Sequence, residues 1–197
     1  GGLVTALVPI CRAQRGAWVG WTGAATSRGA AVRPFTHEGI GIRPVTLSEA
    51  EVDGFYHQMS NRTFWPLYHD AIRTPDFDHR WWRPYFEVNR RYARAAASVA
   101  GKGDLVWVHD YHLQLVPGMI RELRPDVKIG FFLHIPFPPE ELFAWLPWRE
   151  KILRGPAGAD VVGFQTHASA LNFVRAARQF AGAEGEARCW QVAEGDG

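Results

Sequence analysis

The second half of the chain alternates short apolar runs with longer helical patterns, and this order limits the fold more than any other feature. Strands are predicted at residues 104–109, 128–134 and 160–164, and helices at 116–124, 140–145, 149–154 and 167–180. Such a β-α-β-α-β order builds a parallel sheet, because helical crossovers return the chain to the same edge. The run at 128–134 is apolar on both faces, as in a strand covered by helices. We therefore expect an α/β fold with a doubly wound, mostly parallel sheet.

The first hundred residues carry weaker patterns. A helix is predicted at residues 3–10, kinked by Pro9, and a strand at 18–21. Residues 23–36 are rich in Gly, Ala, Thr and Arg and predict a mobile loop or hairpin. Thr46 or Ser48, with acidic residues after it, begins a predicted helix that reaches residue 58, and 85–100 reads as an alanine-rich helix.

Composition excludes several classes of protein. Apolar residues make up 47% of the chain and charged residues 21%, so a packed core is expected. The 22 basic and 20 acidic side chains form no long run, which disfavours a nucleic-acid or anionic-membrane partner. The longest apolar stretch, 129–137, is interrupted by His134 and Pro136 and is too short for a membrane helix. Cys11 and Cys189 lie far apart and suggest neither a disulfide scaffold nor a zinc site, which favours a reducing, cytoplasmic setting.

Polar side chains follow each of the three predicted strands. In an open parallel sheet, ligands bind at the carboxyl ends of the strands. This chain places there His109, Asp110 and His112 after the first strand, His134 after the second, and Gln165, Thr166 and His167 after the third. Asp110 with its two histidines could hold a metal, act as a general base or bind the hydroxyls of a polyol. The spacing disfavours a metal, since it is not the helical arrangement that zinc enzymes use. The structural alternative is that Asp110 caps the next helix while the histidines bind backbone carbonyls.

Two further segments have the character of ligand sites. Gly1 and Gly2 precede a predicted helix, where bare backbone amides attract phosphate, although most such pairs form turns. Residues 56–69 mix aromatic rings with amides and hydroxyls, as sugar-binding segments do. Trp65 precedes Pro66 in what we predict to be a loop, so its ring would face a ligand. The alternative for Trp65 is core packing.

Taken together, these segments resemble the N-terminal, Rossmann-like domain of the trehalose-6-phosphate synthase family, retaining glycosyltransferases of the GT-B type, family 20. The resemblance is strongest to actinobacterial members and runs in family order through residues 1–3, 18–21, 56–67, 106–113, 129–138 and 163–166. It implies transfer of glucose from UDP-glucose, or another nucleoside diphosphate glucose, to glucose 6-phosphate. The product would be α,α-trehalose 6-phosphate, formed with retention and without a metal or another cofactor.

The resemblance also implies roles for individual residues. Tyr56 would bind the phosphate of the acceptor, and Asp110 one of its hydroxyls. Trp65 and Ile135 would shape the pocket that selects the α-anomer, while His134 would hold the transferred glucose. Gly1 and Gly2 would form the loop that approaches the donor's diphosphate. Trp21 would be a second aromatic wall of the sugar site. Trp107, inside a predicted strand, is expected in the core.

The same resemblance predicts that residues 1–197 are a partial N-terminal domain on the acceptor side. The family begins with a strand ending in Asn-Arg, whose arginine grips the acceptor phosphate, and it continues into a donor-binding C-terminal domain. Neither is in this sequence, so we expect the chain alone to be catalytically silent. Pro156 departs from the family pattern and should end the preceding helix early. A homo-oligomer is compatible with the sequence. Two alternatives stay open: a non-catalytic sugar-phosphate-binding domain, and another GT-B sugar transferase.

Overall fold

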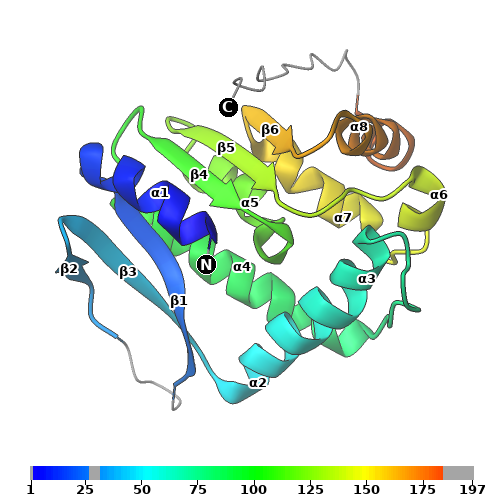
Figure 1. Ribbon diagram of the computed structural model, residues 1–197, viewed down its shortest axis with the longest axis horizontal. Helices are drawn as coiled ribbons and strands as arrows, with labels where there is room; N and C mark the ends of the chain where they lie inside the picture. The colour runs from blue at the N-terminus through cyan, green and yellow to red at the C-terminus, as the bar shows by residue number, and fades with distance from the viewer. Residues whose placement is uncertain (1, 27–31, 184–197) are drawn as a thin grey trace.

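The computed structural model describes residues 2–26 and 32–183, whose strands form two three-stranded sheets (Figure 1). The first sheet has the order β1-β3-β2, with β3 parallel to β1 and antiparallel to β2, and the second has the parallel order β4-β5-β6. The strands are β1 (Ala17–Ala25), β2 (Phe35–His37), β3 (Ile40–Leu47), β4 (Leu105–His109), β5 (Lys128–Leu133) and β6 (Val161–Phe164). The expected α/β, mostly parallel class is confirmed.

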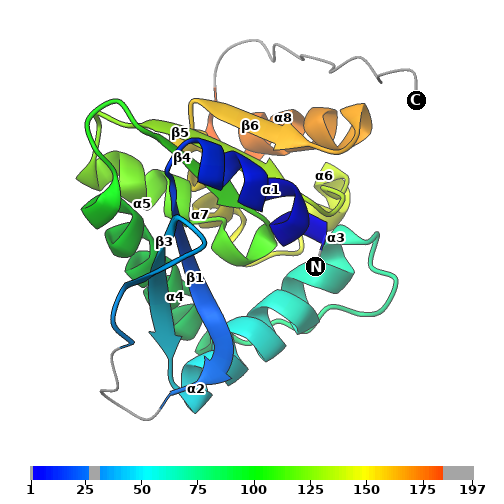
Figure 2. The same cartoon turned by 60° about the vertical axis from the view of Figure 1, so that its left-hand side comes forward.

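Helices pack around both sheets, and Figure 2 shows α8 beside β6, with α2 at the opposite end of the molecule. The α-helices are α1 (Gly2–Ala13), α2 (Glu49–Glu51), α3 (Trp65–Tyr68), α4 (His79–Val99), α5 (Val116–Leu123), α6 (Glu140–Phe143), α7 (Arg149–Arg154) and α8 (His167–Ala181). Three other helical segments are the π-helix η1 (Val52–Phe64) and the 3-10 turns η2 (Tyr111–Leu113) and η3 (Pro156–Gly158). None of the helices within the described residues is long and apolar enough to cross a membrane.

The first half of the chain differs most from the sequence prediction. The loop expected at 23–36 is wrong at both ends, because β1 extends to Ala25 and β2 begins at Phe35; residues 27–31 lie outside the described residues. Strand β3 was not predicted. It contains Pro44 although it is the central strand, paired there with Gly20 of β1. A proline inside a strand pattern normally argues against a central strand.

A continuous helical stretch follows β3 and runs from α2 through η1 to α3. Ser48 and Glu51 form a capping box, in which the Ser48 hydroxyl accepts from the Glu51 amide and the Glu51 carboxylate accepts from the Ser48 amide. The predicted loop at Trp65 and Pro66 is wrong, since Trp65 begins α3. Pro66 therefore lies inside the helical stretch, at the point where η1 passes into α3.

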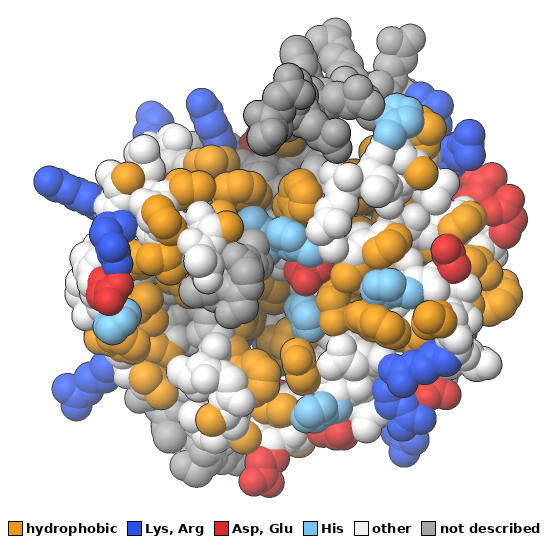
Figure 3. All heavy atoms as spheres, in the orientation of Figure 1, with side chains coloured by type: hydrophobic (Ala, Val, Ile, Leu, Met, Phe, Trp, Pro, Cys, Tyr) orange, Lys and Arg blue, Asp and Glu red, His pale blue; other side chains and the backbone are white. Residues whose placement is uncertain are grey.

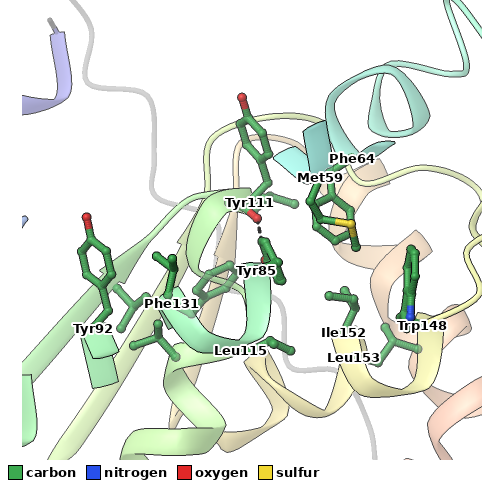
Figure 4. Close-up of a cluster of buried hydrophobic side chains, with 14 of the residues drawn as sticks. Met59, Phe64, Tyr85, Tyr92, Tyr111, Leu115, Phe131, Trp148, Ile152 and Leu153 are labelled. Carbon is green, nitrogen blue, oxygen red and sulfur yellow. Dashed lines mark hydrogen bonds between the residues drawn. The ribbon is translucent and has the colours of Figure 1, made fainter. Parts of the chain in front are cut away.

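Helix α4 provides the centre of the core, and Tyr85 has no exposed surface (Figure 4). The Tyr85 hydroxyl donates to the Tyr111 carbonyl at 2.8 Å, and the bond is drawn in Figure 4. Asn89, also fully buried, donates to the His112 carbonyl at 3.0 Å and accepts from the Leu115 amide at 3.1 Å. These bonds satisfy buried backbone groups of the turn that follows β4 and hold that turn against α4.

Helix α7 ends at Arg154, before Pro156, as predicted. The glycines on either side of this proline are required by close packing. A Cβ on Gly155 would lie 2.0 Å from the Gln114 carbonyl oxygen, and one on Gly158 would lie 2.5 Å from Cα of Gly118. The segment that departs from the family pattern therefore packs backbone to backbone against the start of α5.

A groove of about 750 Å³ separates the two sheets. Backbone edges of β1 and β4 line it, with Leu7 and Ile10 of α1 and with Tyr92 and Ala96 of α4. The expectation that Trp107 belongs to the core is wrong, because 47% of its surface is exposed. Trp107 lines the groove, where β4 is an edge strand with β5 as its sheet partner.

Candidate active site

Most of the predicted site residues lie around the carboxyl ends of β4 and β5. Histidine and acidic side chains gather near the middle of this face of the molecule, bordered by hydrophobic side chains (Figure 3). His109 is the last residue of β4, Asp110 follows it, and His134 follows β5. Trp21 is the middle residue of β1. The rule that parallel strands present a site at their carboxyl ends therefore applies to this chain.

Aromatic rings from three different elements form one wall of the site. Tyr56 of η1 stacks on His112, with ring centroids 5.4 Å apart and planes at 12°. Trp21 of β1 lies against Tyr56 at 5.6 Å, and Tyr111 lies against His112 at 4.0 Å. The Tyr111 hydroxyl donates to the Asn61 side chain of η1 at 3.1 Å. The π-helix, β1 and the turn after β4 thus meet around Tyr56.

Asp110 adopts an unusual backbone conformation, with φ 73° and ψ 167°. This region is nearly restricted to glycine and costs other residues about 1–3 kcal/mol. One carboxylate oxygen accepts from the Tyr111 amide at 2.9 Å, so Asp110 caps the short turn η2. The capping part of the structural alternative is therefore correct, and it leaves the second carboxylate oxygen without a hydrogen bond from the part of the chain that the structure describes. The other part is wrong, because His109 contacts His134 and the buried Nε2 of His112 has no partner among the described residues, so neither ring binds a backbone carbonyl there. The bonds from Tyr85 and Asn89 of α4 hold the strained turn in place.

His109 and His134 contact each other through their ring nitrogens. Nδ1 of His109 lies 3.0 Å from Nε2 of His134. Burial, followed by the neighbouring His134, lowers the pKa of His109 to about 4, against a smaller opposing effect of Asp110. Burial also lowers the pKa of His112. These two imidazoles are therefore neutral near pH 7.

The loop that carries Ile135 is fixed by α8. The Phe137 amide donates to Oγ of Ser169 at 3.2 Å, and the Asn172 side chain donates to the Phe137 carbonyl at 3.1 Å. Thr166 caps α8 through the Ser169 amide. Ile135 itself is partly buried and packs against the core. This arrangement keeps the residues after β5 at the same edge as Asp110.

Two of the predicted positions are less closely joined to this cluster. Trp65 lies further along the helical stretch than Tyr56, where it stacks on His69 at 4.2 Å and lies under the Arg73 guanidinium at 5.9 Å. Gly2 begins α1, as the predicted helix start requires, whereas Gly1 lies outside the described residues.

Sequence reasoning missed two members of the site. Tyr111 and Asn61 join the turn after β4 to η1. Both lie in segments that resemble the family, but no role of its own was predicted for either residue. His112 was noted as a strand-end polar residue without a separate role. Its Nε2 is buried and has no hydrogen-bond partner within residues 2–26 and 32–183. Over the same residues, no three His, Cys, Asp or Glu side chains are grouped so that they could hold a metal ion.

Comparison with known proteins relates this arrangement to one enzyme family. The model of glycosyltransferase family 20 matches residues 1–196. The trehalose-6-phosphate synthase of Mycolicibacterium gilvum is 53% identical over 186 residues, which are 93% of this chain and 37% of that protein. The chain therefore spans little more than a third of the length of this relative.

Two solved structures share the fold. One, described as trehalose-6-phosphate from E. coli bound with UDP-2-fluoro glucose, matches with a TM-score of 0.85 and 32% identity, over 91% of this chain and 40% of that one. The other is an α,α-trehalose-phosphate synthase (UDP-forming) from Burkholderia xenovorans in complex with glucose-6-phosphate. It matches with a TM-score of 0.79 and 29% identity, over 88% of this chain and 39% of that one. The chain belongs to glycosyltransferase family 20.

Proposed function

We propose that the chain is the acceptor-side part of an enzyme that transfers glucose from UDP-glucose to glucose 6-phosphate and forms α,α-trehalose 6-phosphate. The observation that carries the proposal is the convergence of Trp21, Tyr56, Asp110 and His134 at one sheet edge. Relatives of this family include structures described with a UDP-glucose analogue and with glucose-6-phosphate, which supports both substrates.

On the acceptor side, Tyr56 and Asp110 have the required chemistry. The ring of Tyr56 is held between Trp21, which it meets at a tilt, and His112, on which it stacks. Its hydroxyl can therefore donate to the phosphate with little loss of side-chain entropy. The second carboxylate oxygen of Asp110 can accept from a sugar hydroxyl. The aromatic wall offers apolar faces to the C–H groups of the ring. Trp65 and Ile135 would limit the pocket and select the α-anomer.

On the donor side, His134 would hold the transferred glucose. Retaining transfer on one face of the sugar needs accurate positioning and stabilisation of developing charge rather than a protein nucleophile. The N-terminus of α1, at Gly2, would lie toward the diphosphate, because the exposed amides and the dipole of a helix start favour anions. Gly1 would belong to the same loop.

The groove between the two sheets supports the proposal that the domain includes a further strand outside these 197 residues. Trp21, in the middle of β1, meets Tyr56, which stacks on His112 just beyond β4, so the two strands approach the same group of rings. A strand placed between them would pair with both and join the sheets into one. Its alternate side chains would face α1 and α4, which line the groove. Such a strand would end beside Asp110, where it could add a phosphate ligand.

The proposal is tested in the full-length protein that contains this chain, by UDP release in the presence of glucose 6-phosphate and by identification of the product. Tyr56→Phe keeps the stacked ring and removes the hydroxyl. It should raise KM for glucose 6-phosphate by about 10-fold or more with little change in kcat, as expected for one hydrogen bond to a charged group. Asp53→Asn, an exposed position on the same helix, is the control and should leave both constants unchanged.

Other outcomes separate the alternatives. Binding of glucose 6-phosphate without UDP release would identify a non-catalytic domain, and a product other than trehalose 6-phosphate would identify a different transferase. Either result would overturn the proposed function. His134→Ala should reduce turnover by orders of magnitude, and an unchanged rate would refute its role. The 197-residue chain alone is expected to release no UDP.

A further inference from the structure

The contact between His109 and His134 is set by the backbone of two neighbouring strands. In the parallel pairing of β4 and β5, His109 lies beside Phe132, and His134 follows two residues later. The Trp107 ring lies 4.8 Å from that of His109, and the Phe132 ring lies 4.8 Å from that of His134. Strand register and these aromatic neighbours together restrict both imidazoles to the orientation in which their nitrogens are 3.0 Å apart.

A nitrogen–nitrogen contact of this length requires a single proton between the two rings. Two N–H groups would repel each other, and so would two lone pairs. When both rings are neutral, one nitrogen donates and the other accepts, so each ring is held in one tautomer. In either arrangement Nε2 of His134 is already engaged. Nδ1 is then the nitrogen of His134 that can bind a ligand.

We propose that His109 is a positioning residue for the transfer reaction: by engaging Nε2 of His134, it fixes the ring and directs Nδ1 to the transferred sugar. This inference rests on the proposed function. It adds a residue that does not itself touch the reacting atoms, and it assigns the two nitrogens of His134 to different partners.

Charge supports the same role. Burial lowers the pKa of His109 to about 4, so this ring stays neutral under physiological conditions. In the proposed transfer, positive charge develops on the sugar. A neutral imidazole behind His134 orients it without adding a cation next to that charge, whereas a lysine or arginine in the same place would oppose the reaction.

Two substitutions in the full-length protein separate positioning from packing. His109→Asn retains a polar atom at the place of Nδ1, and His109→Leu retains side-chain volume without a hydrogen bond. The leucine variant should lower kcat by about 100-fold, the scale of effect that misplaced groups have on rate. Its KM for glucose 6-phosphate should change little, because the acceptor residues are untouched. The asparagine variant should recover most of the lost kcat.

A wild-type kcat in the leucine variant, or an equal loss in both folded variants, would overturn the proposal. A spectroscopic arm does not depend on activity or on a mutant that folds. In the wild-type protein labelled with ¹⁵N-histidine and studied at alkaline pH, where both rings are neutral, the ring nitrogens of His109 and His134 should each show the shifts of a single tautomer, and exchange averaging between tautomers would contradict the inference. If the wild-type protein transfers no glucose, the proposed function fails while this measurement still tests the pairing.

Discussion

Replacement of Asp110 by glycine should yield a more stable protein than replacement by alanine, the reverse of the usual order. Both changes remove the carboxylate and its bond to the Tyr111 amide, so this loss cancels when the two variants are compared. They differ in the backbone. At φ 73° and ψ 167° a residue with a Cβ bears a strain of about 1–3 kcal/mol, which glycine does not.

Glycine also has a cost, because it gains more freedom in the unfolded chain than alanine does. That cost is about 0.5–1 kcal/mol. Subtracting it from the relieved strain leaves Asp110→Gly about 1 kcal/mol more stable than Asp110→Ala. Ser98 provides a matched control, since it is exposed on α4 in ordinary helical geometry. Because Ser98 lies in the last turn of α4, which ends at Val99, the glycine variant there should be less stable than the alanine variant by at most about 1 kcal/mol.

The four variants are unfolded in urea, with Trp fluorescence as the probe, and the free energy of unfolding of each is obtained from its curve. The sign of the glycine-minus-alanine difference should change between position 110 and position 98. If Asp110→Gly is less stable than Asp110→Ala by the margin seen at Ser98, the turn after β4 is not strained and the reasoning is refuted. Under the proposed function, both Asp110 variants should also lose affinity for glucose 6-phosphate in the full-length protein, because both lack the carboxylate that would accept from a sugar hydroxyl.

Two further results are expected. The free energy of unfolding should be fully retained above pH 6.5 and fall as the pH drops toward 4, because His109 takes up a proton in the unfolded chain at a higher pH than in the folded protein. His109→Asn should make this pH dependence less steep, and an unchanged slope would contradict the prediction. In hydrogen exchange, the outward amides of β1 and β4 should exchange rapidly in the 197-residue chain and slowly in the full-length protein, where a strand is proposed between them. Amides of β5 should be protected equally in both, and rapid exchange from β1 and β4 in both would argue against the strand.

The sequence was most informative where local pattern and tertiary packing agree. The three strands and the helices after residue 100 follow from periodicity, and the strand-end rule alone marks Asp110 and His134. Tyr56 and Trp21 required the family resemblance, since no local pattern shows that they meet. Trp107 shows the limit of alternation, which reports that a strand has an apolar face but not whether another element covers it.

Backbone conformation accounts for other differences. The positive φ of Asp110 has no signature in the sequence, because aspartate is rare in that region and is kept there by bonds from Tyr85 and Asn89, which are far away in the chain. The contact between His109 and His134 likewise depends on the register of β4 with β5. Neither could be deduced from residue spacing.

The π-helix η1 gives the segment that carries Tyr56 a geometry that the sequence does not predict, since only an ordinary helix was expected there. Hydrogen bonds there join residues five apart, as when the Trp65 amide donates to the Ser60 carbonyl. With 3.6 residues per turn, Tyr56 and Asn61 would lie about 140° apart around an α-helix. In an i→i+5 helix the angle between them is much smaller, so Tyr56 can stack on His112 while Asn61 accepts from Tyr111. The wider helix therefore brings Tyr56 and Asn61 to two neighbouring residues after β4, His112 and Tyr111. An α-helix of this sequence would not produce that arrangement.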